Sequence, residues 1–416
     1  MKKIIFIFIF SILFATELPV GFTQEEWEKR HLIEMMGRET DPPIGPIRNI
    51  SEYEPMQGAL IRYPFGISTS VIKEMAEDVK VYCLVSSGQQ NSAFNSMNNA
   101  NVNMDNVEFI LGATDSYWTR DYGPWWVVDG NGDIGIVDFT YNRPRINDNE
   151  APLKVSNHLN VPYYSADFVS AGGNYMTDGF GLSASTQIAY TENNECNTNN
   201  DTSVPLPPCN YVDNIMEEYY GIDEYHVVAD PNNEYIDHID CWAKFLSPTK
   251  MLIRSVPISH SQYDEIEEIV DYFENNTAFN IFRVYTPNDQ PYTNSLILND
   301  KVFVPVMNSS WDDEALDVYQ DALPNHEILP FTGSWVSTDA LHCRIKGIPD
   351  ISLYEYSLGD VNMDSMINVL DIVLVVNFVL GTDNPSNIQN NLSDINSDGI
   401  LNVLDIILLV NIIIGN

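Results

Sequence analysis

Two copies of one short acidic segment lie near the C-terminal end of the chain. Because the copies share one spacing of polar residues, both should fold into the same kind of loop. The copies are residues 360–371 and residues 394–405. In both, side chains with oxygen atoms recur at loop positions 1, 3, 5, 9 and 12, a spacing that lets a loop surround Ca²⁺ with about six to eight oxygen atoms. An apolar segment follows each copy, at residues 369–380 and 403–414. The pattern therefore predicts two calcium loops, each leading into a helix.

The predicted calcium ligands occupy the same positions in both copies. A backbone carbonyl fills the seventh position of such a loop, so any residue type is allowed there. The alternative interpretation is a pair of acidic turns that precede two helices without binding a metal. The predicted ligands are Asp360, Asn362, Asp364, Met366, Asn368 and Asp371 in the first copy, and Asp394, Asn396, Asp398, Ile400, Asn402 and Asp405 in the second.

The repeat resembles type I dockerin modules, in which a duplicated calcium loop and helix pair binds a cohesin domain. The resemblance covers residues 358–416, and we assign residues 357–416 to this module. It implies bound calcium and a cohesin-type partner. The loops depart from the ordinary EF-hand because position 12 is Asp371 or Asp405, and because Ser365 replaces glycine at position 6 of the first loop. Both helices are so apolar that we expect the large domain or a partner to cover them.

The overall composition indicates a folded and strongly acidic protein. Of the 416 residues, 44% are hydrophobic and 11% aromatic, which suits a large core in about two or three domains. Acidic residues number 59 against 20 basic residues, and the formal net charge is -39. Such a surface repels nucleic acid and anionic lipid and favours cations and basic ligands. We therefore expect no nucleic-acid partner.

The N-terminal end has the features of an export signal. Two lysines follow Met1, and the apolar run over residues 4–15 is too short to span a bilayer. We assign residues 1–19 to a signal peptide and residues 20–50 to an N-terminal extension. We expect a secreted or cell-surface protein without a membrane span. Within the extension, the charged stretch that begins at Thr23 indicates a helix start or a propeptide-like segment.

Short apolar runs alternate with helix-like segments over residues 51–356. This alternation predicts an α/β domain. We find no internal repeat in this part of the sequence. The expected strands include residues 59–63, 79–85, 107–111 and 134–139, and the expected helices include residues 70–78, 262–273 and 314–322.

The five cysteines are few for an exported chain and odd in number. Cys196 and Cys209 flank a polar, proline-rich loop that would suit a local disulfide. Cys83 lies in an apolar strand pattern, and Cys241 points away from its neighbour on an expected strand, so we assign both to the core. Cys343 is the thiol that needs another explanation.

An imidazole and a carboxylate occur two residues apart, at His238 and Asp240. If this run is a strand, both side chains emerge on one face, because side chains alternate along a strand. A second carboxylate, Asp121, lies among aromatic residues and a turn at residues 118–125, a composition typical of a ligand cleft. Taken singly, each motif also fits a solvated strand end or a surface turn.

One thiol, one imidazole and two carboxylates fit two kinds of chemistry. A papain-like protease would use Cys343 and His238 with a single orienting group, which leaves one carboxylate without a role. In hydrolysis of a guanidinium group, Asp121 and Asp240 each bind a pair of N–H groups of the planar cation. Cys343 then attacks the central carbon as a thiolate. His238 protonates the departing ammonia and next activates water.

Several motifs together resemble the Porphyromonas-type peptidylarginine deiminases, relatives of agmatine deiminase in the guanidino-modifying superfamily. The resemblance runs from about residue 53 to residue 350. It implies a pentein-like fold, a five-bladed propeller of ββαβ units with the active site on its axis, for a catalytic domain at residues 51–356. The motifs are residues 118–125, 141–145, 172–174, 238–240 and 341–343.

The resemblance also implies roles for individual residues. It makes Cys343 the nucleophile and His238 the general acid and base. It makes Asp121 and Asp240 the groups that bind the guanidinium, and it places Asn294 beside the thiol. The remaining residues that it implies are Trp118, Asp178, Tyr235 and Ile236 in the substrate pocket, and Arg143 and Arg145 as the pair that holds the α-carboxylate of the substrate.

The two arginines decide the expected substrate. The C-terminal carboxylate of a peptide suits a guanidinium fork, whereas agmatine has no carboxylate. We therefore expect conversion of C-terminal arginine in peptides or proteins to citrulline and ammonia, through a thiouronium intermediate on Cys343 and without a cofactor for catalysis. The alternatives are an agmatine or free-arginine deiminase, and an inactive binding protein displayed through the calcium module.

Overall fold

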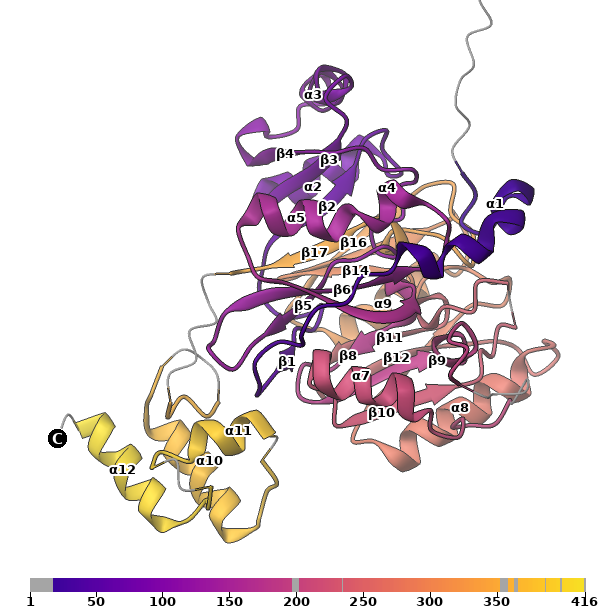
Figure 1. Ribbon diagram of the computed structural model, residues 1–416. Coiled ribbons are helices and arrows are strands. Elements are labelled where there is room, and N and C mark those ends of the chain that lie inside the picture. Colours follow the sequence, from indigo (N-terminus) through magenta and orange to yellow (C-terminus); the bar gives the residue numbers. More distant parts are fainter. Residues whose placement is uncertain are drawn as a thin grey trace, which may run out of the picture.

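The computed structural model of this chain describes residues 18–196, 202–233, 235–351, 358–362, 366–385, 387–396 and 399–414 (Figure 1). A large α/β domain is followed by a small helical module. Nearly all of the predicted export signal lies outside the described residues, as do two predicted calcium ligands, Asp364 and Asp398.

The described strands form five separate sheets, and each sheet contains the same three-strand unit. In each unit, the middle strand pairs antiparallel with one neighbour and parallel with the other. Helical segments connect the two parallel strands, because a tight turn cannot join strands that run in the same direction. The mixed α/β class predicted from the sequence is confirmed. The repeat of ββαβ units is a structural repeat that the sequence does not reveal.

Three of the sheets consist of this unit alone. Their strands are β8 (Met176–Thr177), β9 (Leu182–Thr186) and β10 (Glu224–Val228), then β11 (Ala243–Ser247), β12 (Lys250–Ser255) and β13 (Asn280–Tyr285), and finally β14 (Leu296–Leu298), β15 (Lys301–Val306) and β16 (Glu327–Thr332). The other two sheets carry one more strand. They are β1 (Arg48–Asn49) with β5 (Trp125–Val128), β6 (Ile134–Tyr141) and β7 (Tyr163–Ser170), and β17 (Lys346–Pro349) with β2 (Met56–Arg62), β3 (Lys80–Val85) and β4 (Val107–Leu111).

The sheet that contains β17 closes the large domain. β17 comes from the C-terminal part of this domain, yet it pairs antiparallel with β2 near the start, with Lys346 opposite Leu60. The segment just before β17 contains Cys343. The pairing therefore returns the thiol to the beginning of the domain.

The helices between the strands are amphipathic. α8 (Tyr263–Asn276) buries Ile266, Ile269, Val270 and Phe273 at the spacing of one helix face. The other described helices of the large domain are α2 (Thr69–Asp78), α3 (Gln90–Asn99), α4 (Ile146–Asn149), α5 (Ala151–Leu159), α6 (Ile188–Thr191), α7 (Asn210–Tyr220) and α9 (Asp312–Ala322), with short 3-10 helices η1 (Arg30–Leu32), η2 (Glu34–Met36), η3 (Met104–Asn106), η4 (Gly172–Asn174), η5 (Ile239–Cys241) and η6 (His342–Arg344).

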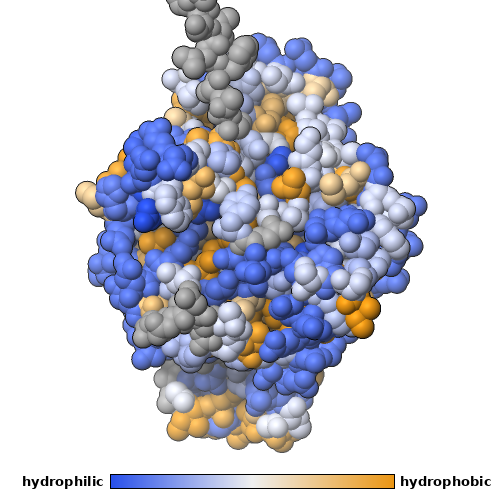
Figure 2. Space-filling model, turned by 90° about the vertical axis from the view of Figure 1, so that its right-hand side faces the viewer, coloured by the Kyte–Doolittle hydropathy of each residue, from blue (hydrophilic) through white to orange (hydrophobic). Residues whose placement is uncertain are grey.

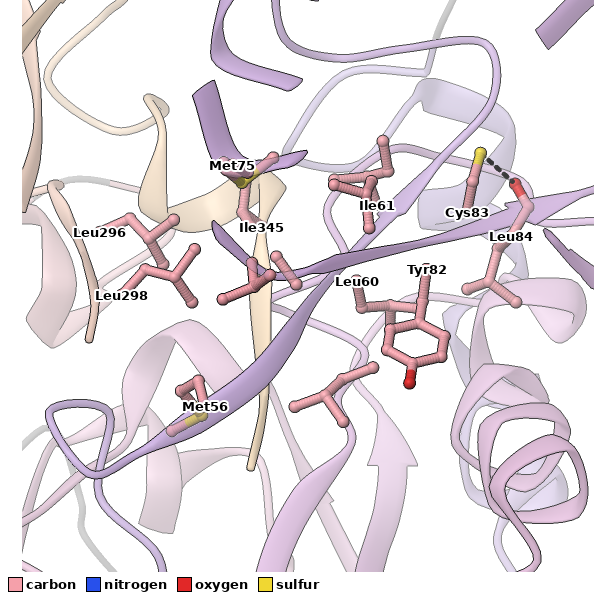
Figure 3. Packing of buried hydrophobic residues seen from close by; sticks show 14 of the residues in the cluster. Met56, Leu60, Ile61, Met75, Tyr82, Cys83, Leu84, Leu296, Leu298 and Ile345 are labelled. Atoms are coloured by element: carbon pink, nitrogen blue, oxygen red, sulfur yellow. Dashed lines mark hydrogen bonds between the residues drawn. The ribbon is translucent and has the colours of Figure 1, made fainter. Parts of the chain in front are cut away.

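Figure 3 shows part of the core around β2 and β3. Leu60 and Ile61 lie opposite Tyr82 and Cys83 in parallel register, and all four side chains are buried. Complete burial of a leucine or isoleucine side chain contributes about 2 kcal/mol. The core therefore holds β2 firmly in place, and with it the sheet that receives β17.

The cysteines lie where the sequence patterns suggested. Cys196 and Cys209 form a disulfide. Cys83 and Cys241 keep their thiols and are buried in hydrophobic clusters. Cys343 is the remaining free thiol, and it is buried as well.

The N-terminal extension begins with a capped helix, α1 (Gln24–Lys29). The Thr23 hydroxyl accepts a hydrogen bond from the Glu26 amide at 3.1 Å, and the Glu26 carboxylate accepts one from the Thr23 amide at 2.8 Å. This capping box fixes the start of the helix. Figure 1 shows the chain running from α1 across the large domain to β1.

The C-terminal module contains α10 (Val369–Leu380), α11 (Asn387–Ser393) and α12 (Val403–Ile414). The two predicted helices therefore form over the expected residues. Val375, Phe378 and Leu409 are buried between the helices, whereas other apolar residues stay exposed, among them Leu370 and Leu404. Figure 2 shows hydrophobic side chains at the lower end of the molecule.

The expectation that the large domain covers these helices is wrong, because Leu370 is 57% exposed and Leu404 is 53% exposed. Each apolar helix has more hydrophobic residues than one narrow contact with its partner helix can bury. Coverage by a partner stays a prediction. None of the described helices is both long enough and apolar enough to cross a bilayer.

Candidate active site

A candidate site residue lies just before the first strand of each ββαβ unit. These residues are Asp121 before β5, Gly173 before β8, Asp240 before β11, Asn294 before β14 and Cys343 before β17. Because the five units repeat one topology, the segments that link them occupy equivalent positions. Each of the five segments therefore carries one candidate residue at the same point of its unit.

Gly173 marks the point where three of these groups meet. A Cβ atom on Gly173 would lie 2.6 Å from Asp121 Oδ1, 2.8 Å from His238 Nδ1 and 3.2 Å from Asp240 Oδ2. Real Cβ atoms essentially never approach other atoms within 3.0 Å. The absence of a side chain at Gly173 therefore lets two carboxylates and an imidazole converge on one small space beside its backbone.

Asp121 is a buried carboxylate with an unpartnered oxygen. Its backbone amide donates to the Trp118 carbonyl at 3.0 Å, and its carbonyl accepts from the Gly172 amide at 2.7 Å. Its side chain is 2% exposed, and Oδ1 has no hydrogen-bond partner in the described structure. Burial, followed by the charge of Asp240, raises the pKa of Asp121 well above its usual value. A cationic donor bound beside this oxygen would satisfy it.

His238 is a buried imidazole whose two ring nitrogens have no hydrogen-bond partner in the described structure. Its Nδ1 lies 3.7 Å from Asp121 Oδ1. Burial lowers the pKa of His238 to about 4, although the charge of Asp240 opposes this shift. At neutral pH the ring is therefore neutral and able to accept a proton.

The segment around His238 is not the strand that the sequence suggested. Asp237 has a left-handed backbone with φ of 49°, and η5 begins at Ile239. The Ile239 amide donates to Asn174 Oδ1 at 3.1 Å, and the Cys241 amide donates to the His238 carbonyl at 3.2 Å. The local hydrogen bonds thus replace strand pairing. His238 and Asp240 still reach the same space because a tight helical turn separates them.

Cys343 is buried beside Asn294 and Asp240. Asn294 Nδ2 donates to Cys343 Sγ at 3.2 Å, and Asn294 Oδ1 accepts the Cys343 amide at 3.3 Å. Cys343 Sγ lies 3.6 Å from Asp240 Oδ2. Burial, followed by the charges of Asp240 and Asp121, raises the pKa of Cys343 well above its usual value. The sulfur is therefore a thiol until a cation neutralises the carboxylates.

Asp240 makes a contact that sequence reasoning missed. Its Oδ2 lies 2.6 Å from His342 Nδ1, and His342 Nε2 lies 2.6 Å from Glu52 Oε2. Burial raises the pKa of Asp240, but the hydrogen bond with His342 and the charges of His342 and His238 outweigh burial and hold the pKa below its usual value. His342 adjoins the nucleophile in the sequence, so its position was a usable clue. Glu52 lies near the other end of the domain, and no spacing pointed to it.

Arg143 and Arg145 both contact the N-terminal extension. Arg143 Nε donates to the Val20 carbonyl at 3.2 Å, and Arg145 Nε lies 2.7 Å from Glu26 Oε1. The Arg145 guanidinium also lies 5.4 Å from the Trp118 ring. Their predicted role toward a substrate carboxylate stays a proposal.

The other predicted pocket residues differ in their surroundings. Trp118 and Ile236 are buried, and Tyr235 is exposed at the surface. Asp178 Oδ1 accepts the backbone amides of Phe180 and Leu182 at 2.7 and 3.0 Å. Asp178 therefore stabilises the turn between β8 and β9, and its role in a substrate pocket stays a prediction.

The described residues of the C-terminal loops fold around the last carboxylate of each loop. Asp371 accepts the amides of Val361 and Asn368 at 2.8 Å each, which also caps α10. Asp405 accepts the Asn402 amide at 2.9 Å. The described residues contain no group of three His, Cys, Asp or Glu side chains placed to hold a metal. The predicted ligands in these loops are oxygen atoms of Asp and Asn side chains and of backbone carbonyls, which are the ligand type that Ca²⁺ prefers.

Two family models match this chain, one over the large domain and one over the C-terminal module. The family model of the Porphyromonas-type peptidyl-arginine deiminases matches residues 66–349, and the model of the dockerin type I domain matches residues 358–414. The fold is that of deiminases that act on guanidino groups. The chain belongs to the Porphyromonas-type peptidyl-arginine deiminase family and carries a C-terminal dockerin type I domain.

Individual relatives and solved structures agree with this assignment. The agmatine deiminase of Pseudomonas aeruginosa (strain UCBPP-PA14) is 23% identical over 333 residues, which cover 66% of this chain and 84% of the relative. The C. jejuni agmatine deiminase structure has a TM-score of 0.61 at 19% identity and covers 73% of this chain and 96% of its own. The Enterococcus faecalis agmatine deiminase structure has a TM-score of 0.62 at 17% identity and covers 81% and 100%. At these identities the two structures establish a shared fold.

Proposed function

We propose that this protein hydrolyses the guanidinium group of arginine at the C-terminus of peptides or proteins, giving citrulline and ammonia. The observation that carries the proposal is the convergence of Asp121, His238 and Asp240 at Gly173, where only a residue without a side chain fits. Cys343 lies 3.6 Å from one of these carboxylates. A flat cation bound there would present its central carbon to the sulfur.

The charges at this space favour a guanidinium over a neutral substrate. Asp121 Oδ1 is buried without a partner, and Asp240 Oδ2 borders the same space. Each carboxylate can accept two parallel N–H bonds from a guanidinium. A neutral ester has no such set of N–H groups and would leave Asp121 Oδ1 without a partner.

The bound cation starts the reaction by changing the protonation of the site. It neutralises the two carboxylates, so the Cys343 thiol can pass its proton to the neutral ring of His238. The thiolate forms a bond to the guanidinium carbon, and the proton on His238 moves to the departing nitrogen, which leaves as ammonia. His238 then takes a proton from water as the hydroxyl group adds to the same carbon. The C–S bond breaks, citrulline leaves, and Cys343 recovers its proton.

The arginine pair supports a peptide with a free carboxylate as the substrate. Arg145 lies 5.4 Å from the ring of Trp118, and Trp118 lies in the same hydrophobic cluster as Cys343. Two adjacent guanidinium groups near the site can bind one carboxylate. The second candidate is agmatine deimination, because the similar proteins of Pseudomonas aeruginosa and Enterococcus faecalis carry that name.

Parallel assays separate the candidates. The purified chain is supplied with a peptide that ends in arginine, with the same peptide amidated at its C-terminus, with agmatine and with free arginine, and citrulline and ammonia are measured. We expect the highest kcat/KM for the free-acid peptide and at least about a tenfold loss on amidation. Turnover of agmatine without turnover of the peptide contradicts the substrate assignment. No turnover of any of them favours a binding protein without enzymatic activity.

We further propose that the five ββαβ units form a five-bladed propeller with the thiol site on its axis. The placement of one site residue before each unit supports this arrangement. We propose Ca²⁺ in the C-terminal module, held by the predicted oxygen ligands, together with a cohesin-type partner for the apolar helices and export from the cell. The dockerin type I match supports these proposals.

A further inference from the structure

Two buried carboxylates bracket the imidazole that precedes the nucleophile. His342 is 3% exposed. Its Nδ1 lies 2.6 Å from Asp240 Oδ2, and its Nε2 lies 2.6 Å from Glu52 Oε2. An ionised carboxylate only accepts hydrogen bonds, so a ring nitrogen that carries a proton donates to the carboxylate that it faces. The His342 ring therefore fixes the position of the Asp240 carboxylate relative to the Glu52 carboxylate.

Glu52 is the fixed end of this arrangement. Lys244 Nζ lies 2.7 Å from Glu52 Oε1, and Arg120 Nη2 lies 2.6 Å from Glu52 Oε2. The Ile297 amide also donates to Glu52 Oε1 at 2.9 Å. Two cations and an amide thus hold the Glu52 carboxylate, and through His342 they set the orientation of Asp240.

We infer that His342 is a positioning residue for the reaction and acts through Asp240. Asp240 Oδ2 is the oxygen that accepts from His342, and the same oxygen lies 3.6 Å from Cys343 Sγ and borders the space at Gly173. Rotation of this carboxylate would withdraw one of the two guanidinium-binding groups. The inference rests on the proposed function.

Substitutions that remove or retain the donor test this role. In His342→Ala the donor to Asp240 is lost, and we expect kcat for the arginyl peptide to fall about 10- to 100-fold. In His342→Asn the amide nitrogen can replace Nδ1, so kcat should stay within about fivefold of the wild type. The matched control is His158→Ala, which removes a similar contact, 2.7 Å from Glu108, at the surface. Its kinetics should be unchanged.

The comparison of the two variants is decisive. Equal losses in His342→Asn and His342→Ala, or wild-type kcat in His342→Ala, would overturn the inference. If His342→Ala does not fold, His342→Gln is the substitute variant. The longer glutamine side chain fills the site, but its amide group lies beyond the position of Nδ1 and cannot donate to Asp240. A wild-type chain without turnover of any guanidino compound counts against the proposed function instead, so the two failures are distinct.

A second inference rests on a different part of the structure, the N-terminal strap, which we define as residues 20–29. The strap supplies partners to both arginines of the proposed carboxylate site. The Gly21 carbonyl accepts from Arg145 Nη2 at 3.0 Å, and Glu26 Oε1 lies 2.7 Å from Arg145 Nε. The Phe22 ring lies 4.5 Å from the Arg143 guanidinium.

The strap also reaches the apolar residues around the thiol. Val20 is buried in the hydrophobic cluster that contains Trp118, Ile236 and Cys343. Gly21 lies against the Tyr235 ring, since a Cβ atom on Gly21 would be 2.5 Å from a ring atom. Three of the six predicted substrate-binding residues, Arg143, Arg145 and Tyr235, are therefore in contact with the chain's own N-terminal segment.

Glu26 offers Arg145 the same chemical group that a peptide C-terminus would offer. Burial raises the pKa of Glu26, but the hydrogen bonds from Arg145 and from the Thr23 backbone outweigh burial and hold the pKa below its usual value. Glu26 is therefore an anion at neutral pH. We propose that the strap is autoinhibitory, with the Glu26 carboxylate in the place of the substrate carboxylate.

Two variants of the full chain form a matched pair for this proposal. Glu26→Gln removes the charge that faces Arg145 but keeps an oxygen for the Thr23 amide. Glu25→Gln alters the neighbouring residue, which pairs with Lys29 at the exposed surface. We expect Glu26→Gln to raise kcat/KM for the arginyl peptide about tenfold, because a larger fraction of the protein is open. Glu25→Gln should match the wild type.

Removal of the strap gives a readout that does not depend on turnover. A variant that begins at Gly37 retains the Thr40 amide contact with Ser165 at 3.0 Å. Alkylation of Cys343 by iodoacetamide, followed by mass spectrometry of the peptide that contains it, should be at least about tenfold faster in this variant than in the full chain. Equal alkylation rates would overturn the strap proposal. Faster alkylation without any turnover would uphold it and count against the proposed function.

Discussion

Asp240 and Cys343 are 103 residues apart in the sequence, and Asp240 Oδ2 lies 3.6 Å from Cys343 Sγ. A carboxylate in this position disfavours a thiolate, and burial disfavours it further. The thiol of the resting site should therefore react slowly with electrophiles that carry no positive charge. In the proposed mechanism, a guanidinium between the carboxylates reverses this effect, so that activation of the sulfur depends on binding of the substrate.

Substitution of Asp240 should separate thiol reactivity from catalysis. Asp240→Asn removes a negative charge that raises the pKa of Cys343, so alkylation of Cys343 at pH 7 should become faster while turnover falls by at least about 100-fold. Rates of alkylation across pH 6–10 provide the measurement. Slower alkylation in Asp240→Asn would contradict this electrostatic explanation.

A methyl group on Gly173 should block the guanidinium site. The added Cβ would lie 2.6 Å from Asp121 Oδ1 and 2.8 Å from His238 Nδ1. We expect Gly173→Ala to lose at least about 100-fold in kcat/KM, because a misplacement of about 1 Å is enough for such a loss. Gly88→Ala is the control, since its Cβ would have no neighbour within 4 Å. Wild-type kinetics in Gly173→Ala would refute the location of the substrate.

The two carboxylates should have opposite effects on stability. The pKa of Asp121 is raised in the folded state, so the folded protein loses stability as the pH rises through that pKa, and Asp121→Asn should raise the melting temperature at pH 7. The pKa of Asp240 is lowered, so its ionised form stabilises the fold at pH 7, and Asp240→Asn should lower the melting temperature. Thermal unfolding at pH 7 tests both signs. Equal shifts in the same direction would contradict the assignment.

Calcium should affect the C-terminal module and leave catalysis unchanged. Removal of Ca²⁺ with EDTA should lower helical ellipticity at 222 nm, because oxygen ligands repel one another without the ion. Asp371→Ala should abolish part of this response, since Asp371 joins residues at both ends of the first loop. Loss of kcat on EDTA treatment would contradict the proposal that catalysis in the large domain does not depend on Ca²⁺ in the C-terminal module.

Local elements were predictable because their causes are local. The expected strand at residues 107–111 coincides with β4, and the expected helices at 369–380 and 403–414 coincide with α10 and α12. Apolar periodicity and a preceding cap determine such segments directly. The placement of the cysteines followed from the same patterns.

The assembly of the site was not predictable from these local patterns. The pairing of β17 with β2 joins distant parts of the chain, and only this closure brings Glu52 to His342. The contact of Glu26 with Arg145 is likewise long-range. The strand expected at His238 failed because hydrogen bonds from elsewhere in the fold determine that turn. The resemblance to a known family supplied what periodicity could not.

Acid quenching during turnover, followed by mass spectrometry of the peptide that contains Cys343, tests the central claim most directly. With an arginyl peptide as substrate, we predict a covalent adduct on Cys343 whose mass equals that of the substrate minus ammonia. The adduct should be absent in Cys343→Ala, which should release no ammonia. Steady release of ammonia from Cys343→Ala, with no adduct on the wild-type chain, would contradict the account.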